Sequence, residues 1–190
     1  MPFLRSCCFT GYRPEKYSFD PDGNSSEAAH MQTALALAVN DLIDRGVKVF
    51  YHGGARGFDL IAAETVLEAS RFNPVRLVTV LPFPEFSDSW SPEWYRRLNH
   101  VIKNSTEVIT CSEAYHRGAY AKRNRYLVDH SDCVLTYFDG VKGGTANTLA
   151  YAEKQHRVII NLADEHPVIP PGSEADGYPI YIVGQLPFCD

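Results

Sequence analysis

Short apolar runs alternate with longer segments of helical period, and this alternation is the feature that most restricts the fold. Six runs read as short, nearly continuous buried strands, at residues 3–10, 47–51, 75–81, 107–111, 132–138 and 157–161. Strands of this kind are typical of parallel sheets that are covered on both faces. Because helical segments separate them, we expect an α/β fold: a doubly wound, mainly parallel sheet with right-handed crossovers and helices on both faces.

The first helical segment has the clearest boundaries. Apolar residues recur on one face from Met31 to Leu42, Ser25 and Ser26 can cap the start, and Gly46 follows the end. Further helices are expected at residues 59–70, 92–104, 120–130 and 145–155.

The chain has 190 residues, which suits one domain with a sizeable core. Beyond residue 162 the pattern breaks at several Pro and Gly residues, with one more short strand indicated at 180–183. We expect a single domain over 1–190, with 163–190 as a packed C-terminal tail. No apolar run approaches the ~18–20 residues of a membrane span, and the first residues lack the pattern of a signal peptide. A cytoplasmic protein without a membrane partner is expected.

The charge balance restricts the partners. There are 18 Lys and Arg residues against 23 Asp and Glu, a net charge of −5. This balance disfavours a dedicated binder of duplex DNA or anionic membranes, but a local basic cluster can still bind one phosphate group. The five cysteines include no C-x-x-C pair, so neither a disulfide framework nor a metal site is expected.

Several residues that suit ligand binding directly follow strands of the predicted sheet. In a parallel sheet these positions share one edge, where ligands bind. The candidates are Thr10, Gly11 and Arg13 after the first strand, Gly53, Gly54, Ala55, Gly57 and Asp59 after the second, and Asp139, Gly143, Gly144 and Thr145 after the fifth.

Two of these turns are rich in glycine and open a helix. Glycine lets the backbone approach a ligand closely, and a helix start presents free N–H groups and partial positive charge, so each turn can form a phosphate site. One such turn is more often an ordinary tight turn, but two at one edge favour the phosphate site. Neither turn is G-x-G-x-x-G or G-x-x-x-x-G-K-[ST], so a standard dinucleotide fingerprint and a P-loop are unsupported.

A basic run adds positive charge near the same edge. Arg117, Lys122, Arg123 and Arg125 lie within nine positions of an otherwise acidic chain. A solvated helix face and a phosphate clamp both explain the run, and the sequence leaves the two open. Trp90 can stack on a base or cap the core.

Together these elements resemble the SLOG superfamily and, within it, the DUF1273 or YpsA-like family, over about residues 4–162. The resemblance rests on C-F-T-G-Y-R-P at 8–14, G-x-x-x-G-x-D at 53–59, Trp90, R-N-R at 123–125, and Y-F-D-G at 137–140 leading to G-G-T at 143–145. It implies a Rossmann-like fold and a pocket for a nucleotide or a nucleotide-derived ligand such as NAD or ADP-ribose. Arg123 and Asn124 join the candidate site on this basis.

Two related families suggest alternatives. The lysine-decarboxylase-like phosphoribohydrolases share an arginine at the position of Arg123, but residues 147–148 are Asn-Thr where their catalytic glutamate is expected. N-glycosidic hydrolysis would then need Asp59, Asp139 or Glu153 as a substitute. The DNA-processing protein A family, which binds single strands, has a similar A-R-G-x-D loop and R-N-R sequence. A single-strand groove needs distributed positive charge, which an acidic chain disfavours.

The leading expectation is therefore a protein that binds or senses a small phosphorylated, nucleotide-derived molecule. Its phosphate would lie on the two glycine-rich helix starts, with Arg123 as the ion-pair partner. The second expectation is a nucleotide N-glycosidase that uses the same pocket, and the third is single-stranded nucleic-acid binding. No cofactor is indicated beyond a bound nucleotide or NAD-like ligand, and the sequence leaves a homo-oligomer open.

Overall fold

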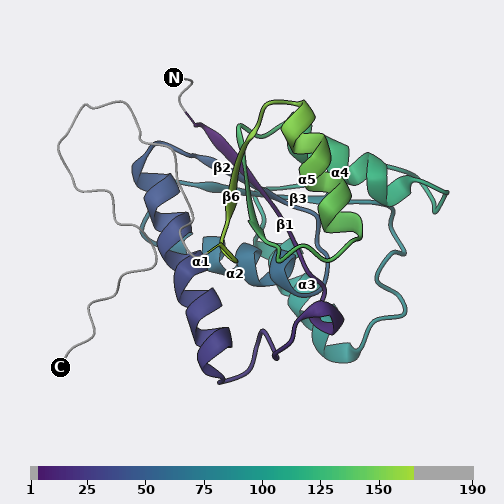
Figure 1. Ribbon diagram of the computed structural model, residues 1–190. Helices are drawn as coiled ribbons and strands as arrows, with labels where there is room; N and C mark the ends of the chain where they lie inside the picture. The colour runs from purple at the N-terminus through teal and green to yellow at the C-terminus, as the bar shows by residue number, and fades with distance from the viewer. Residues whose placement is uncertain (1–3, 165–190) are drawn as a thin grey trace, which may run out of the picture.

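The computed structural model describes residues 4–164, which contain one six-stranded sheet (Figure 1). The strands are β1 (Ser6–Gly11), β2 (Val49–His52), β3 (Arg76–Leu81), β4 (Glu107–Thr110), β5 (Cys133–Tyr137) and β6 (Val158–Asn161). Their order is β4-β3-β2-β1-β5-β6, and every neighbouring pair is parallel. The predicted doubly wound α/β fold is thus confirmed, and the six strands predicted up to residue 161 are present with slightly different ends.

Five α-helices cover the sheet in two layers. They are α1 (Ser26–Asp44), α2 (Phe58–Ser70), α3 (Pro92–Asn104), α4 (Ala119–Asp129) and α5 (Gly144–Lys154). Figure 1 shows α1, α2 and α3 on one face and α4 and α5 on the other. The Ser25 hydroxyl caps α1 by accepting a hydrogen bond from the Ala28 N–H (3.2 Å), as the sequence predicts.

The pleat of the strands divides the core between these layers. In β1, Cys7 and Phe9 pack with α1 and α2, whereas the Cys8 between them packs with α4 and α5. Because successive side chains point to opposite faces, a strand buried on both faces needs apolar residues in succession. This requirement explains the nearly continuous apolar runs in the sequence.

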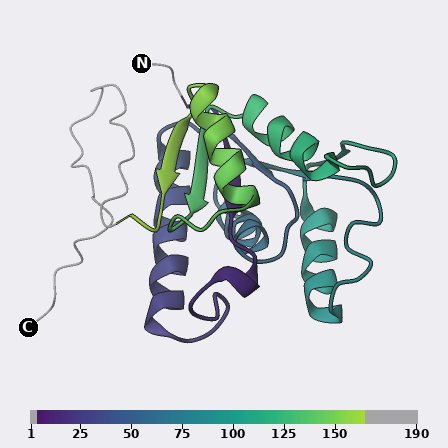
Figure 2. The ribbon, with the colours of Figure 1, turned by 45° about the vertical axis from the view of Figure 1, so that its right-hand side comes forward.

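The strand order reverses between β1 and β5, which are neighbours in the middle of the sheet. Strands β2 to β4 are added on one side of β1, and β5 and β6 on the other. In Figure 2 the arrowheads of β5 and β6 point to the lower edge of the sheet, where the short helix η1 (Pro14–Lys16) follows β1. This is the edge at which α/β sheets of this kind bind ligands. The strand predicted at 180–183 and most of the predicted tail lie outside the described residues.

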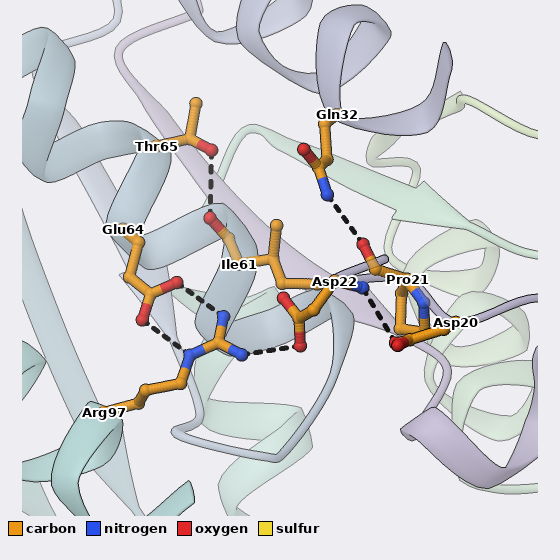
Figure 3. A network of polar contacts seen from close by, with 8 residues as sticks. All are labelled: Asp20, Pro21, Asp22, Gln32, Ile61, Glu64, Thr65 and Arg97. Atoms are coloured by element: carbon orange, nitrogen blue, oxygen red, sulfur yellow. Dashed lines mark hydrogen bonds and ion pairs between the residues drawn. The ribbon is translucent and has the colours of Figure 1, made fainter. Parts of the chain in front are cut away.

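Arg97 ties the loop before α1 to α2 and α3 (Figure 3). Its Nε and Nη2 donate to the two carboxylate oxygens of Glu64 on α2 (2.8 and 2.6 Å), and its Nη1 donates to Asp22 (2.6 Å). The guanidinium also lies 4.4 Å from the centre of the Trp94 ring. The nearby Gln32 side chain donates to the Pro21 carbonyl (2.8 Å), which holds the same loop against α1. The loop is therefore anchored to three helices.

Replacing Arg97 with Met should destabilise the protein by about 1–2 kcal/mol, because a bidentate pair and a third charged hydrogen bond are lost together. Urea unfolding measures the change. Arg96→Met on the exposed side of α3 is the matched control and should change the free energy of unfolding by less than about 0.5 kcal/mol. Equal effects of the two substitutions would contradict the anchoring role of Arg97.

Candidate functional site

The end of β1 is hydrogen-bonded to the starts of both α2 and α5, the two helices that follow glycine-rich turns. The Phe58 N–H at the start of α2 donates to the Tyr12 carbonyl (3.1 Å), and the Thr145 hydroxyl at the start of α5 donates to the Gly11 carbonyl (2.9 Å). A Cβ on Gly11 would lie 2.6 Å from the Phe58 ring, so close packing here requires glycine. The two turns that the sequence analysis singled out therefore lie beside the same two residues.

The loop between β2 and α2 is held from within by Asp59. One carboxylate oxygen of Asp59 accepts hydrogen bonds from the N–H groups of Gly53 and Ala55 (2.8 Å each), while the Gly54 N–H donates to Nδ1 of His52 (3.1 Å). Three N–H groups of this loop thus already have acceptors inside the protein. The loop is rigid, and its amides are less free for a ligand than the glycine pattern alone indicates.

His52 anchors the same loop to the sheet in its neutral form. Because Nδ1 accepts from Gly54, Nε2 carries the proton and donates to Thr79 Oγ1 (2.6 Å). Thr79 then bonds to Ser105 Oγ (2.6 Å), which donates to the Val101 carbonyl (2.8 Å). Burial, helped by the charge of Arg123, lowers the pKa of His52 to about 3. This histidine therefore has a structural role as an uncharged hydrogen-bonding group.

Arg123 is a buried cation whose hydrogen bonds are incomplete. It is 7% exposed, its Nη1 lies 3.8 Å from the nearer Asp59 oxygen, and its Nε has no hydrogen-bond partner among residues 4–164. Burial lowers the pKa of Arg123 and raises that of Asp59, and their mutual attraction opposes both shifts. A Cβ on Gly53 would overlap the guanidinium group of Arg123, so this group can pack against the loop only because residue 53 is glycine.

Arg123 lines a cleft of about 200 Å³ at the carboxyl edge of the sheet. The lining residues are Arg13, Ala55, Arg56, Phe86, Ser89, Trp90, Tyr120 and Arg123. Three of these side chains are guanidinium groups and three are aromatic, and within the described part of the chain none of them is a carboxylate. Such a lining suits an anion that carries a flat or apolar group.

Arg56 stands at the rim of the cleft with partners of its own. Its Nη2 pairs with the Glu15 carboxylate of η1 at 2.6 Å, and its guanidinium lies 5.8 Å from the centre of the Trp90 ring. On the other side of η1, Lys16 donates to the Lys142 carbonyl (3.0 Å) in the loop before α5. The short helix η1 thus connects the two glycine-rich loops.

The Tyr12 side chain fills the space between the carboxyl ends of β1 and β5, where the strand order reverses. Its ring is 1% exposed, and its hydroxyl donates to the Asp139 carboxylate and accepts from the N–H groups of Asp139 (3.2 Å) and Val141 (2.9 Å). The phenol therefore occupies the space between the end of β1 and the loop after β5. The open cleft lies beside it, next to the loop after β2.

The structure brings together a part of the candidate residues. Arg13, Ala55 and Arg123 line the cleft, and Gly53 and Asp59 contact Arg123 directly. Gly54 and Gly57 have positive φ angles of 69° and 85°, which keep the loop in its conformation, and a Cβ on Gly57 would overlap the Tyr12 carbonyl.

The remaining candidates lie outside the cleft lining. Asn124 donates to Thr148 Oγ1 (2.9 Å) and so joins α4 to α5, Thr10 pairs with Thr136 inside the sheet, and Asp139 binds Tyr12. Gly143, Gly144 and Thr145 form the start of α5, on the far side of the β1 end.

Trp90 lines the cleft but was only noted as an aromatic that can stack on a base or cap the core, and four further lining residues were absent from the sequence-based candidates: Arg56, Phe86, Ser89 and Tyr120. A signal existed for two of them. Arg56 stands within the G-x-x-x-G-x-D turn, and Tyr120 precedes Arg123 by three positions, which places both on one face of a helix. Phe86 and Ser89 follow β3 in an irregular segment, and nothing in the pattern of that segment predicts their approach to the cleft.

The basic run divides between two sides of α4. Arg123 turns inward to the cleft, whereas Arg117, Lys122 and Arg125 line a separate, shallower groove of about 680 Å³ between α4 and the edge strand β4. Lys122 donates to the Cys111 carbonyl, and Arg125 lies 5.7 Å from the Tyr151 ring centre. The solvated-face interpretation fits Arg117, Lys122 and Arg125, which are exposed, whereas the phosphate clamp stays a prediction for Arg123.

The described residues show neither a metal-binding cluster nor a membrane-spanning helix. Residues 4–164 contain no group of three or more His, Cys, Asp and Glu side chains that could hold a metal ion. They also contain no helix of the length and apolar character needed to cross a membrane.

Fold and cleft together define a Rossmann-like protein with an arginine-lined cleft at the carboxyl edge of its sheet. The chain belongs to the YpsA family, described as the YspA SLOG family, whose sequence profile matches residues 7–162. The resemblance noted from the motifs is thus confirmed. Domains of the SLOG type bind nucleotide-derived ligands.

Similar proteins are found among bacterial sequences. The SPbeta prophage-derived protein YoqJ of Bacillus subtilis is 29% identical over 143 residues, which cover 66% of this chain and 82% of YoqJ. A UPF0398 protein of Halalkalibacterium halodurans is 26% identical over 145 residues, covering 75% of this chain and 76% of the relative.

Two solved structures share the fold. DNA processing protein A from Helicobacter pylori, described with a single-stranded DNA binding mode, superimposes with a TM-score of 0.58 at 19% identity and 83% coverage of this chain. The Streptococcus pneumoniae protein of the same name gives 0.57 at 18% identity and 92% coverage. This chain spans 64% and 53% of those two chains, so the similarity concerns one fold unit within longer proteins.

Gly53→Ala should destabilise the protein by about 1–3 kcal/mol, because the new Cβ displaces the buried Arg123 guanidinium. Gly144→Ala is the matched control. A Cβ there meets no atom within 4 Å, and alanine in the first turn of α5 should leave stability unchanged or raise it by about 0.4–1 kcal/mol. Thermal unfolding of both variants measures the difference, and a stable Gly53→Ala protein would argue against the packing of Arg123 on Gly53.

Acid should destabilise the protein through His52. Its pKa falls from 6.5 to about 3 on folding, so between these values the unfolded chain binds a proton that the folded protein does not. The free energy of unfolding should therefore fall with decreasing pH, by about 2 kcal/mol from this residue between pH 7 and pH 5. His52→Asn keeps an acceptor for the Gly54 N–H and should flatten the profile in this range. Parallel profiles in urea unfolding would contradict the assignment.

Proposed function

We propose that the protein binds the phosphate-bearing part of a small nucleotide-derived molecule in the cleft around Arg123. The observation that carries this proposal is the state of Arg123: it is 7% exposed, its Nε lacks a hydrogen-bond partner within residues 4–164, and its nearest carboxylate is 3.8 Å away. A buried charge with an unsatisfied donor is costly, and an anion in the cleft would balance the charge of the guanidinium group.

The remaining lining supports a nucleotide-derived ligand. Arg13 adds a guanidinium group that can bind phosphate oxygens, and Trp90 and Tyr120 supply aromatic surface for a base or sugar. Membership of a family whose domains bind nucleotide-derived ligands agrees with this chemistry.

The start of α5 is proposed as a separate anion-binding surface, which the end of β1 and the Tyr12 ring divide from the cleft. Gly144 has open space around the position of a Cβ and no positive φ, so the fold itself does not require glycine there. The first turn of α5 carries no acidic residue, and Gly143 lies against the Lys16 ammonium group. A phosphate approaching this helix start would meet positive charge and no steric barrier.

Hydrolysis of a glycosidic bond receives no support from the cleft. The carboxylates considered as substitutes for the missing glutamate are engaged or distant: Asp59 accepts two backbone N–H groups, Asp139 binds Tyr12, and none of the residues lining the cleft in the described part of the chain is acidic. Binding without turnover is therefore the function that we propose.

Arg123→Gln should weaken binding of nucleoside monophosphates about ten- to a hundredfold, because a charge-assisted hydrogen bond in a partly dry cleft is worth about 1.5–3 kcal/mol. Lys122→Gln, one residue away in the outer groove, is the matched control and should change affinity by about threefold or less. Isothermal titration calorimetry with AMP, GMP, CMP and UMP measures both.

Circular dichroism establishes that the Arg123→Gln protein is folded, and Arg13→Gln provides a second variant at an exposed position of the same cleft. The same titrations with a short single-stranded oligonucleotide test the alternative suggested by the DNA processing protein A fold. Similar losses for Arg123→Gln, Lys122→Gln and Arg125→Gln with the oligonucleotide, and no binding of mononucleotides, would replace the proposed function by strand binding.

A further inference from the structure

We infer that the cleft selects a terminal phosphomonoester, as in a nucleoside monophosphate or a pentose phosphate, over the internal pyrophosphate of a dinucleotide such as NAD. The inference rests on the proposed function and specifies the chemistry of the ligand. Three independent features of the cleft carry it: the state of its backbone N–H groups, the supply of free guanidinium groups, and its volume.

The first feature is the occupied glycine-rich loop before α2. Dinucleotide-binding folds of the Rossmann type place a pyrophosphate on free N–H groups of a glycine-rich helix start. Here the loop N–H groups of Gly53, Gly54 and Ala55 already donate to Asp59 and His52. At the start of the helix itself, the Phe58 N–H donates to the Tyr12 carbonyl. Asp59 also stands in the first turn of α2, where its carboxylate meets the positive end of the helix dipole. Four N–H groups that a pyrophosphate could use along this loop and helix start are therefore already bonded to acceptors of the protein itself.

The second feature is the pairing of the three arginines. Arg56 already has a carboxylate partner in Glu15 at 2.6 Å, whereas the guanidinium of Arg123 is 3.8 Å from Asp59, which is too long for a hydrogen bond. Arg13 forms no ion pair within residues 4–164, and its side chain is exposed at the cleft. Two guanidinium groups thus remain for the ligand.

A phosphomonoester matches these two groups in charge and in geometry. It carries about −1.5 to −2 charges at neutral pH on three terminal oxygens, which two guanidinium forks can bind from two sides. Each phosphate of an internal pyrophosphate carries one charge and two free oxygens, so the same charge is spread over a longer group. Two arginines on one small cleft therefore favour the phosphomonoester, whose negative charge is concentrated on one phosphate group.

The third feature is the volume of about 200 Å³. Pockets that enclose drug-sized ligands occupy about 300–1,000 Å³. The cleft can therefore enclose a phosphate and the group next to it, with the rest of the molecule lying against Trp90 or in solvent. A dinucleotide would leave most of its surface outside the cleft. Its pyrophosphate carries a nucleoside on each side, so the cleft would have to accommodate part of both nucleosides together with the phosphates.

Calorimetric titration of the full chain with matched ligands tests the inference. AMP, its 5′-phosphate methyl ester, ribose 5-phosphate, ADP-ribose and NAD are compared at one pH and salt concentration. AMP should bind at least about tenfold more tightly than its methyl ester, since esterification removes one charge and one acceptor oxygen. NAD and ADP-ribose should bind no better than the ester, and ribose 5-phosphate should retain the preference for a free phosphate end.

Two outcomes overturn the inference in different ways. If NAD, ADP-ribose or the methyl ester binds as tightly as AMP and the affinity is lost in Arg123→Gln, the phosphate site stands and the monoester selectivity is wrong. If AMP, GMP, CMP, UMP and ribose 5-phosphate all fail to bind, both the proposed function and the inference are wrong.

Arg13→Gln supplies a readout that a structural role would not change. It removes one of the two free guanidinium groups at an exposed position, so the ratio of AMP to methyl ester affinity should fall to within about threefold. Lys122→Gln is the control and should keep the ratio of the original protein. An unchanged ratio in Arg13→Gln would remove Arg13 from the selectivity.

Discussion

The Asp59 carboxylate organises the whole site. From the first turn of α2 it accepts the N–H groups of Gly53 and Ala55, which shape the loop after β2, and it faces the Arg123 guanidinium at 3.8 Å. An oxygen that already has two donors satisfies a third only weakly. Asp59 therefore holds the loop and attracts Arg123 without completing its hydrogen bonds. The Asp59 carboxylate thus fixes the loop after β2 and also leaves the Arg123 guanidinium in the cleft without a full set of hydrogen bonds.

Helix α4 separates two surfaces of different chemistry. Tyr120 and Arg123 face the cleft, and Lys122 and Arg125 face the groove beside β4. The helical period alone produces this separation, since residues three positions apart share a face and neighbours do not. The acidic net charge of −5 is thus compatible with one concentrated anion site, because a single buried arginine requires no broad basic surface.

Much of the fold was predictable and the details of the site were less so. Buried strands such as β1 and β5 need apolar residues on both faces, and α1 has a serine cap and a repeating apolar face, so their positions follow from local patterns. The glycines of the loop after β2 and Arg123 were also recognised. Phe86, Ser89 and the closure of the β1 end by Tyr12 were not, because each depends on segments that are distant in the sequence.

The sequence by itself determined the parallel α/β architecture, the edge of the sheet that carries the cleft, and the membership of a family whose domains bind nucleotide-derived ligands. Only the tertiary structure decided which glycine-rich turn borders the cleft and how each arginine is paired. The physical reason is the range of the interactions. Periodicity and caps act within a few residues, whereas the state of Arg123 depends on Asp59, Gly53 and the His52 contacts, which come from other elements and meet only when the sheet has formed.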